Sequence, residues 1–294
     1  MDPDEIRTSN PDKLFYPADG LTKSDVVDHY RTVAEVMVPH LRGRPLTLRR
    51  YPHGIEGQTW FQKEASSHFP DWVRVEEIPQ HHSASVRHVL CEDAATLVYL
   101  ANQAVVEFHI WTSTVDALEK PDLVVIDIDP PEGVTVKELR GIARGASQVY
   151  EAIGLTPYLQ ATGGRGFHVV APLDATAGHD VVRALARGAA ELLVRADPDQ
   201  MTVAQRKDRR GHRVFLDTNR NGYAQTFAAP YSLRARPGAG VATPLDWAEL
   251  TRAKPDGWNP RKLKQRLARK EDPWLDMRAH AASATKALEL LRRF

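Results

Sequence analysis

The sequence of 294 residues has the composition of an ordinary globular chain with little net charge. Hydrophobic residues make up 42% of it, charged residues 26%, and the formal net charge is +1. This balance excludes a protein that binds nucleic acid through a uniformly basic surface, although local basic patches can still bind phosphates. The single cysteine, Cys91, excludes an internal disulfide framework and suits a reducing cytosol. No apolar run approaches the roughly 20 residues of a membrane helix, and the polar N-terminus is unlike a signal peptide.

The first forty residues predict a polar loop followed by a helix. Thr22 is a candidate N-cap with Asp25 three residues later, and apolar residues then recur at helical spacing until Pro39. Three polar residues flank this helix start: Asn10, Lys13 and Lys23. Because a helix N-terminus favours an anion, they form a candidate anion site. Ordinary solvated lysines are the alternative.

Strands are predicted at residues 45–51 and 58–63, around a turn-rich segment. Trp60 and Phe61 are neighbours in the second strand, so their side chains face opposite ways. One ring can then belong to the core while the other is exposed and stacks on a nucleobase, and the alternative is that both are structural. Further strands are predicted at 73–75 and 86–90. A helix at 92–107 precedes a short strand at 108–111.

The segment 122–131 carries the clearest chemical pattern. Four apolar residues predict a buried strand that ends at Pro130 and Pro131, directly after Asp127 and Asp129. Residues i and i+2 of a strand share a face, so the two carboxylates repel each other unless a cation binds. The pattern indicates a divalent-metal site for phosphate chemistry, with an acidic turn as the alternative.

A glycine-rich segment follows the helix predicted at residues 136–153 and the strand predicted at 156–161. It runs Thr162-Gly-Gly-Arg165-Gly-Phe-His168 and leads into another strand. The order strand, loop, strand argues against the P-loop and Rossmann motifs, in which a helix follows the glycines. Glycines still let backbone N–H groups approach phosphate oxygens, and Arg165 and His168 add donors. An ordinary hairpin turn is the alternative.

The last third of the chain is rich in basic residues after the helix predicted at 179–196. A strand at 214–217 ends in Asp217, the natural third ligand for ions bound by Asp127 and Asp129. A strand predicted at 226–236 carries Arg234 and Arg236 on one face. A helix from about residue 244 and a basic stretch at 252–270, interpreted as a solvated surface, complete the prediction.

These blocks together resemble the polymerase domain of the bacterial DNA ligase D family, within the archaeo-eukaryotic primase superfamily. The resemblance extends from residue 10 to residue 250, and its most specific parts lie at 127–130, 162–168, 215–221 and 229–238. It implies an α+β fold in a single domain, residues 1–294. An N-terminal β-rich module (1–120) precedes a primase-type catalytic module (121–245) and a helical tail (246–294).

The resemblance also implies residue roles. Asp127, Asp129 and Asp217 hold two divalent ions, Mn²⁺ or Mg²⁺, with His109 beside the reacting centre. The nucleotide-binding residues are Thr162, Gly163, Gly164, Arg165, Gly166, His168, Arg220, Arg234 and Arg236. The DNA 5′-phosphate is assigned to Asn10, Lys13 and Lys23, and template stacking to Trp60 and Phe61. The family's usual Ser and Lys in the glycine-rich motif are Thr162 and Arg165 in this chain.

The function implied is a DNA-dependent nucleotidyltransferase that adds NTPs, in preference to dNTPs, to a 3′-hydroxyl at gaps or broken ends. Non-homologous end joining or gap repair is the implied context, with a Ku-type end-binding protein and a separate ATP-dependent ligase as candidate partners. The implied location is the bacterial cytoplasm, at the nucleoid and away from membranes. The alternatives are a non-catalytic end-bridging module and a metal-dependent phosphatase. The phosphatase is disfavoured because its Asp-x-Asp motif usually lies near the start of the chain.

Overall fold

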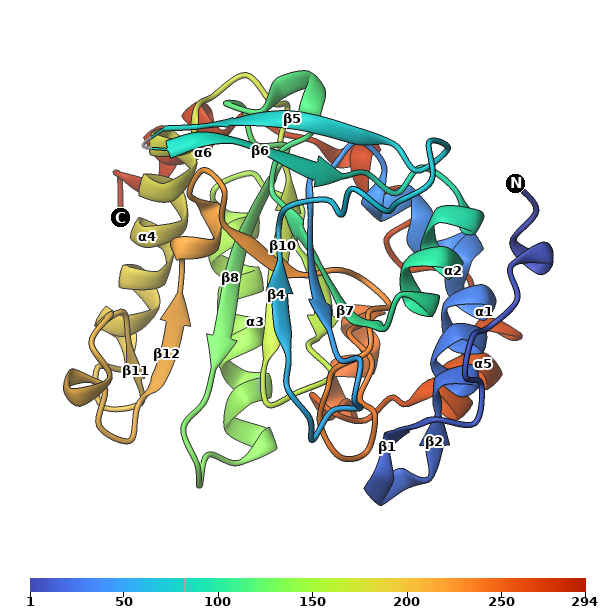
Figure 1. Ribbon diagram of the computed structural model, residues 1–294. Helices are drawn as coiled ribbons and strands as arrows, with labels where there is room; N and C mark the ends of the chain where they lie inside the picture. The colour runs from blue at the N-terminus through green and yellow to red at the C-terminus, as the bar shows by residue number, and fades with distance from the viewer. Residues whose placement is uncertain (82) are drawn as a thin grey trace. The chain divides into compact units, whose positions relative to one another are not determined.

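The computed structural model describes residues 1–81 and 83–294 (Figure 1). The α-helices are α1 (Lys23–Leu41), α2 (Ala94–Asn102), α3 (Val136–Ala152), α4 (His179–Ala196), α5 (Pro260–Leu267) and α6 (Ala284–Leu291). The strands are β1 (Leu14–Tyr16), β2 (Leu21–Thr22), β3 (Leu46–Arg50), β4 (Trp60–Gln62), β5 (Val75–Gln80), β6 (Ser83–Val89), β7 (Val105–Trp111), β8 (Leu123–Asp129), β9 (Tyr158–Ala161), β10 (Phe167–Pro172), β11 (Met201–Thr202), β12 (Val214–Asp217), β13 (Thr226–Ala228) and β14 (Thr243–Leu245). None of the helices in these ranges is long and apolar enough to cross a membrane.

The described residues form two compact units, each assembled from separate stretches of the chain. Unit 1 consists of Met1–Asp116, Thr226–Thr243 and Trp258–Lys270, and unit 2 of Ala117–Gln225, Pro244–Gly257 and Glu271–Phe294. Helices and largely antiparallel sheets occur together, which confirms the predicted α+β class. The single domain with modules 1–120, 121–245 and 246–294 stays a prediction.

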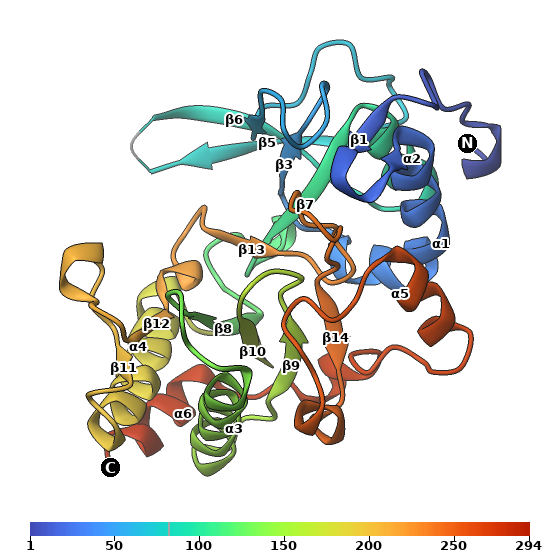
Figure 2. The same ribbon diagram turned by 90° about the horizontal axis from the view of Figure 1, so that it is seen from below.

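Unit 2 is built on a sheet with the strand order β11-β12-β8-β10-β9-β14. Strand β8 runs antiparallel to both of its neighbours, β10 and β12. Val124, Ile126 and Ile128 of β8 are completely buried, as expected for a central strand. Helices α3, α4 and α6 lie together on one face of this sheet (Figure 2). The alternate residues of β8, which include the two aspartates, point to the other face.

Unit 1 contains the sheet β13-β7-β3-β4, with the two-stranded ribbons β5-β6 and β1-β2. Helix α1 packs against α2 and buries an apolar stripe that includes Val26, Tyr30 and Met37. The capping box predicted at its start is confirmed. Thr22 Oγ1 accepts the Asp25 N–H, and the Asp25 carboxylate accepts the Thr22 N–H at 2.7 Å. This cap fixes where the chain of β2 enters the helix.

Two helix boundaries were predicted wrongly in unit 1. Helix α1 continues through Pro39 to Leu41, because a proline near the end of a helix removes only one hydrogen bond. The helix predicted at 92–107 ends at Asn102, and β7 already begins at Val105. Ala104 has a φ of 66°, which stops the helix, and the β-branched residues that follow it pair with β3.

The prediction was also wrong after residue 226. Strand β13 stops at Ala228, because Tyr231 turns the chain with a φ of 67° and donates its N–H to Ala242. Arg234 and Arg236 therefore belong to a loop and not to a strand face. The helix expected from about residue 244 is strand β14 instead. A 3₁₀-helix, Trp247–Thr251, follows directly, and the next α-helix, α5, begins at Pro260.

Candidate functional site

The three predicted metal ligands lie on one face of the unit 2 sheet. Asp217, the last residue of β12, is paired directly with Asp127 of the antiparallel β8, and Phe215 is paired with Asp129. Opposed residues of an antiparallel pair point to the same face, as do residues i and i+2 of one strand. The backbone thus brings the three carboxylates to one edge of one surface. Asp217 is the most buried of them, with 8% of its surface exposed.

Cationic side chains balance these carboxylates. The guanidinium of Arg220 lies 3.4 Å from Asp127 Oδ2 and 3.3 Å from Asp217 Oδ2, and Arg165 lies 3.4 Å from Asp129 Oδ1. Burial raises the pKa of Asp217 and the negative charge of Asp127 adds to this rise, while Arg220 opposes it. Two partly buried carboxylates that lie this close together are stabilised in their charged form by a cation that contacts both.

The donor set suits a hard divalent cation, since every donor is a carboxylate oxygen. The Arg220 guanidinium marks the point between Asp127 and Asp217 where positive charge is stabilised. In the part of the chain that the structure describes, no three His, Cys, Asp or Glu side chains already converge as a metal-binding group.

The glycine-rich segment 162–166 forms a tight hairpin turn between β9 and β10. A Cβ atom on Gly166 would lie 1.8 Å from the carbonyl oxygen of Ile128, so only glycine allows the turn to press against the end of β8. The Thr162 hydroxyl closes the turn by donating to the Gly166 carbonyl and accepting from the Gly164 and Gly166 N–H groups. Gly163, at a φ of 67°, donates its N–H to Pro255. The turn is thereby fixed next to Asp129.

His168 of β10 is paired in register with Asp127 on one side and Gln160 on the other. Its ring is buried, with Nε2 3.4 Å from Asp127 Oδ1 and Nδ1 3.1 Å from the Gln160 amide nitrogen. An amide nitrogen can only donate, so Nδ1 is the acceptor in the neutral ring and the proton is on Nε2. His168 consequently presents an N–H to the carboxylate face.

His109 belongs to unit 1, where it forms a cluster with Glu107, Arg49 and Arg234. Glu107 Oε2 accepts hydrogen bonds of 3.0 Å from His109 Nε2 and from Arg49 Nη1, and Arg234 Nε lies 3.5 Å from Oε1. Burial would raise the pKa of Glu107, but the His109 hydrogen bond and the arginine charges hold it well below its usual range. Burial lowers the pKa of His109 and the Glu107 hydrogen bond opposes this shift.

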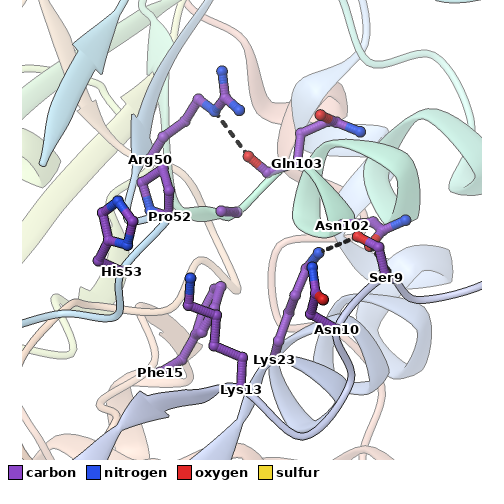
Figure 3. Close-up of a pocket in the computed structure, with 11 residues that line it drawn as sticks. Ser9, Asn10, Lys13, Phe15, Lys23, Arg50, Pro52, His53, Asn102 and Gln103 are labelled. Atoms are coloured by element: carbon purple, nitrogen blue, oxygen red, sulfur yellow. Dashed lines mark hydrogen bonds between the residues drawn. The ribbon is translucent and has the colours of Figure 1, made fainter. Parts of the chain in front are cut away.

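The 5′-phosphate residues predicted near the start of α1 do come together. Asn10, Lys13 and Lys23 line a cavity of about 270 Å³, together with residues that include Ser9, Arg50 and Asn102. The polar ends of Asn10, Lys13 and Lys23 point toward the same space (Figure 3). Lys23 is 5% exposed and donates to Ser9 Oγ at 2.6 Å. Burial and the charge of Lys13 lower the pKa of Lys23 to about 8.

Trp60 and Phe61 are both exposed, by 43% and 58%. The expectation that one of the two rings belongs to the core was wrong, and β4 is an edge strand of its sheet. Both rings line a groove of about 820 Å³, which continues along residues 62–68. Arg50 and Pro52 line this groove as well as the Lys13 and Lys23 cavity, so the two are neighbours. Two exposed aromatic rings suit stacking on unpaired bases.

Sequence reasoning missed several side chains that these clusters contain: Ser9, Arg49, Arg50, Glu107 and Gln160. Glu107 was detectable in principle. It precedes His109 by two residues in a strand, and a carboxylate at that spacing shares the face of the imidazole. Arg49 and Gln160 carry no comparable signal, because each is identified only by its cross-strand partner.

An antiparallel sheet that presents aspartates at the ends of neighbouring strands, next to a glycine-rich turn with arginine and histidine, is typical of primase-type nucleotidyltransferases. The chain belongs to the family of LigD primase-polymerase domains, whose model matches residues 22–274. It is therefore a nucleotidyltransferase of the primase-polymerase class, which excludes the phosphatase alternative.

Individual relatives support the assignment. The chain is 36% identical over 249 residues to the multifunctional non-homologous end joining protein LigD of Mycolicibacterium smegmatis, covering 84% of this chain and 32% of that protein. It is 30% identical over 275 residues to the Pseudomonas aeruginosa protein of the same description, covering 92% and 32%. The chain thus spans about a third of the length of these curated relatives.

A solved structure has the same fold over nearly the whole length of this chain. It is the polymerase domain from Mycobacterium tuberculosis Ligase D in complex with DNA, with a TM-score of 0.87 and 32% sequence identity. The match covers 94% of this chain and 99% of that domain. The primase-type fold expected from the resemblance is confirmed.

Proposed function

We propose that this chain adds nucleotides to a DNA 3′-hydroxyl at gaps and broken ends, with NTPs preferred over dNTPs. The observation that carries this proposal is the register of β8 and β12, which pairs Asp127 with Asp217 beside the glycine-rich turn. Nucleotide addition displaces pyrophosphate in line from the α-phosphorus, and it needs carboxylates that hold cations next to a phosphate-binding backbone. The proposal is supported by the aspartates and the glycine-rich turn lying next to each other in unit 2.

Asp127, Asp129 and Asp217 would hold two divalent cations, Mn²⁺ or Mg²⁺. When bound, such a pair activates the attacking hydroxyl and neutralises the triphosphate and the leaving pyrophosphate. His168 supports this role because its Nε2–H faces Asp127 and restrains that carboxylate. Arg220 lies beside Asp127 and Asp217, and its guanidinium would contact the phosphates of the nucleotide.

The triphosphate is assigned to the glycine-rich turn of Gly163, Gly164 and Gly166, which lets a ligand approach the backbone closely, and to the side chains around it. Arg165 is half exposed and Arg220 is 38% exposed, so both can reach a ligand. Thr162 is proposed to contact the ribose 2′-hydroxyl, for which its own hydroxyl exchanges one of the hydrogen bonds that close the turn. His109, Arg234 and Arg236 of unit 1 are proposed as further nucleotide contacts. The two positive charges of Arg234 and Arg49 outweigh the single negative charge of Glu107. The net positive charge suits an anionic ligand.

The cavity of Asn10, Lys13 and Lys23 is proposed to bind the 5′-phosphate on the far side of a gap. Its two ammonium groups and the amide point into one space, and a terminal phosphate offers acceptors for all three. The adjoining groove lets unpaired template bases stack on Trp60 and Phe61. DNA as a partner is supported by the M. tuberculosis domain, which was solved in complex with DNA.

The cellular role is inferred from the relatives, which are described as non-homologous end joining proteins. We infer the same pathway for this chain, in the bacterial cytoplasm at the nucleoid. A Ku-type end-binding protein and an ATP-dependent ligase would act on the same DNA ends. The ligase seals the nick that nucleotide addition leaves.

The direct test is extension of a gapped duplex with a 5′-phosphate, supplied with NTPs or dNTPs and with Mn²⁺ or Mg²⁺. We expect NTP incorporation that requires the metal and releases pyrophosphate. Asp127→Asn and Asp217→Asn should each abolish it while the thermal unfolding midpoint stays close to that of the wild type. Asp28→Asn, which removes only a surface pair with Arg31, is the matched control. Extension by either active-site variant at the wild-type rate would refute the metal assignment, and a wild type without activity would indicate an end-bridging module.

A further inference from the structure

Glu107 is the buried carboxylate of the cluster around His109. It is 2% exposed, on the central strand β7 of the unit 1 sheet. Burying a carboxylate is unfavourable unless its oxygens are hydrogen-bonded or paired with positive charge. Both oxygens of Glu107 meet that condition, with partners that come from separate parts of the chain.

Each oxygen of Glu107 has a distinct set of partners. Oε2 accepts from His109 Nε2 and Arg49 Nη1, both at 3.0 Å. Oε1 accepts the N–H of Ala235 at 2.9 Å and lies 3.5 Å from Arg234 Nε. An ionised carboxylate can only accept, so the neutral His109 ring must carry its proton on Nε2. That assignment leaves Nδ1 as the acceptor of the imidazole.

The same carboxylate anchors the loop that carries Arg234 and Arg236. Besides the Ala235 N–H bond to Glu107, the Ser232 hydroxyl accepts the Phe108 N–H at 2.8 Å, and the Tyr30 hydroxyl accepts the Leu233 N–H at 3.0 Å. Tyr30 in turn donates to Val106, so the loop is attached along β7. The hydrogen bond from the Ala235 N–H to Glu107 lies directly beside Arg234 and sets the position of the Arg234 guanidinium.

The face that Glu107 organises also contains an unsatisfied polar atom. Thr47 is paired in register with His109, so their side chains point to the same face. Its Oγ1 is buried and has no hydrogen-bond partner in residues 1–81 and 83–294. Buried hydroxyls are nearly always hydrogen-bonded, so an unpaired one beside His109 indicates that a polar ligand or water completes the site.

We propose that Glu107 is a positioning residue for nucleotide binding. Its carboxylate fixes the tautomer and orientation of His109 and holds Arg49 and Arg234 in place to receive the anionic substrate. Arg49 is thereby assigned to the nucleotide site as well, since it shares Oε2 with His109 and a third of its side chain is exposed. This inference rests on the proposed function, because it takes the ligand to be a nucleoside triphosphate.

The test uses the charge-removing, size-conserving variant Glu107→Gln in the full chain. The titration of His109, followed by NMR, is one readout. Glu107 raises the pKa of His109 and Arg49 lowers it, so this pKa should fall in Glu107→Gln and rise in Arg49→Gln. Opposite shifts show that both groups act on His109 through their charges, and the kinetics decide whether this arrangement serves nucleotide binding. Three tyrosines also face the cluster: Tyr16, Tyr30 and Tyr51. Neither variant substitutes any of them.

The second readout is the kinetics of NTP incorporation. KM for the nucleotide should rise about tenfold or more in Glu107→Gln, with a smaller loss of kcat, as expected when charged contacts to a ligand lose their alignment. Glu191→Gln, which breaks an ion pair with Arg187 on α4, is the control and should match the wild type. A wild-type KM for the nucleotide in Glu107→Gln would overturn the proposal, whether or not the His109 pKa shifts.

Two further outcomes are informative. If Glu107→Gln does not fold, Arg49→Gln carries the test, and an unchanged KM for the nucleotide in that variant overturns the proposal. If the wild type neither extends DNA nor binds a fluorescent NTP, the proposed function is wrong. The NMR titration would then still show whether Glu107 sets the state of His109.

Discussion

The pKa of Lys23 predicts a pH limit on recognition of a DNA 5′-phosphate. Burial and the nearby charge of Lys13 lower this pKa to about 8, so the ammonium group in the empty cavity is about 90% charged at pH 7 and about 10% charged at pH 9. Only the charged form attracts a phosphate. Below pH 8 Lys23 stays mostly charged, so its protonation should hardly change the affinity for the 5′-phosphate. Above pH 8 this affinity should fall as Lys23 loses its charge.

The size of the effect follows from linkage. Each pH unit above 8 should lower the phosphate-dependent affinity by about tenfold, until the pH exceeds the higher pKa that Lys23 has with phosphate bound. A phosphate monoester gains its second charge near pH 6, so binding should be strongest between about pH 6 and pH 8. In Lys13→Ala the decline should begin at a higher pH, because a charge that lowers the Lys23 pKa is gone.

The assay is fluorescence anisotropy of two gapped duplexes that differ only in a 5′-phosphate or 5′-hydroxyl, measured from pH 6 to pH 9.5 at constant salt. The ratio of the two dissociation constants isolates the phosphate contribution from general DNA binding. Lys264→Ala, on the exposed side of α5, controls for nonspecific charge loss. A ratio that is unchanged between pH 7.5 and pH 9.5 in the wild type would refute the role of Lys23.

Four further predictions concern other parts of the site. The double variant Lys13→Ala plus Lys23→Ala should bind 5′-phosphorylated and 5′-hydroxyl gaps with nearly equal affinity, while extension of a simple primer–template changes much less. Thr162→Ala should narrow the preference for NTPs over dNTPs in competitive incorporation, and should raise KM for both because the hydroxyl also closes the glycine-rich turn. Gly166→Ala should lower the free energy of unfolding by about 3 kcal/mol in urea titrations, because the added Cβ atom meets the Ile128 carbonyl oxygen. The control is Gly141→Ala in α3, where the added Cβ atom meets no other atom and the change should be neutral or stabilising. Trp60→Ala with Phe61→Ala should weaken binding to gaps with unpaired template bases by about 1–3 kcal/mol for each lost stacking contact, with little effect on blunt duplex.

Local sequence determined much of the secondary structure around the site. The apolar run before Asp127 and the two prolines after Asp129 define β8 and place both aspartates on one face. Thr22 and Asp25 specify the start of α1, and the glycines at 163, 164 and 166 specify a turn between strands. These predictions succeeded because each depends on steric rules and hydrogen bonds within a few residues.

Local signals failed where pairing partners decided the conformation. The segment after Ala101 has helical spacing, yet β7 forms there because Val105 and its neighbours pair with β3. The loop of Arg234 and Arg236 has strand-like composition, but the turn at Tyr231 and contacts to β7 hold it in an irregular path. Intrinsic propensities are weak compared with the burial and hydrogen bonding that a neighbouring strand provides.

The sequence by itself determined that this protein carries aspartates at two strand ends, a glycine-rich turn between strands and basic residues near a helix start. Only the tertiary structure decided that Asp217 lies opposite Asp127, because strand order and register arise from contacts between distant segments. It likewise decided that Glu107 joins Arg49, His109 and Arg234, and that Lys23 is buried enough to lower its pKa. Burial and cross-strand pairing are properties of the folded chain, and both act on side chains that no local pattern connects.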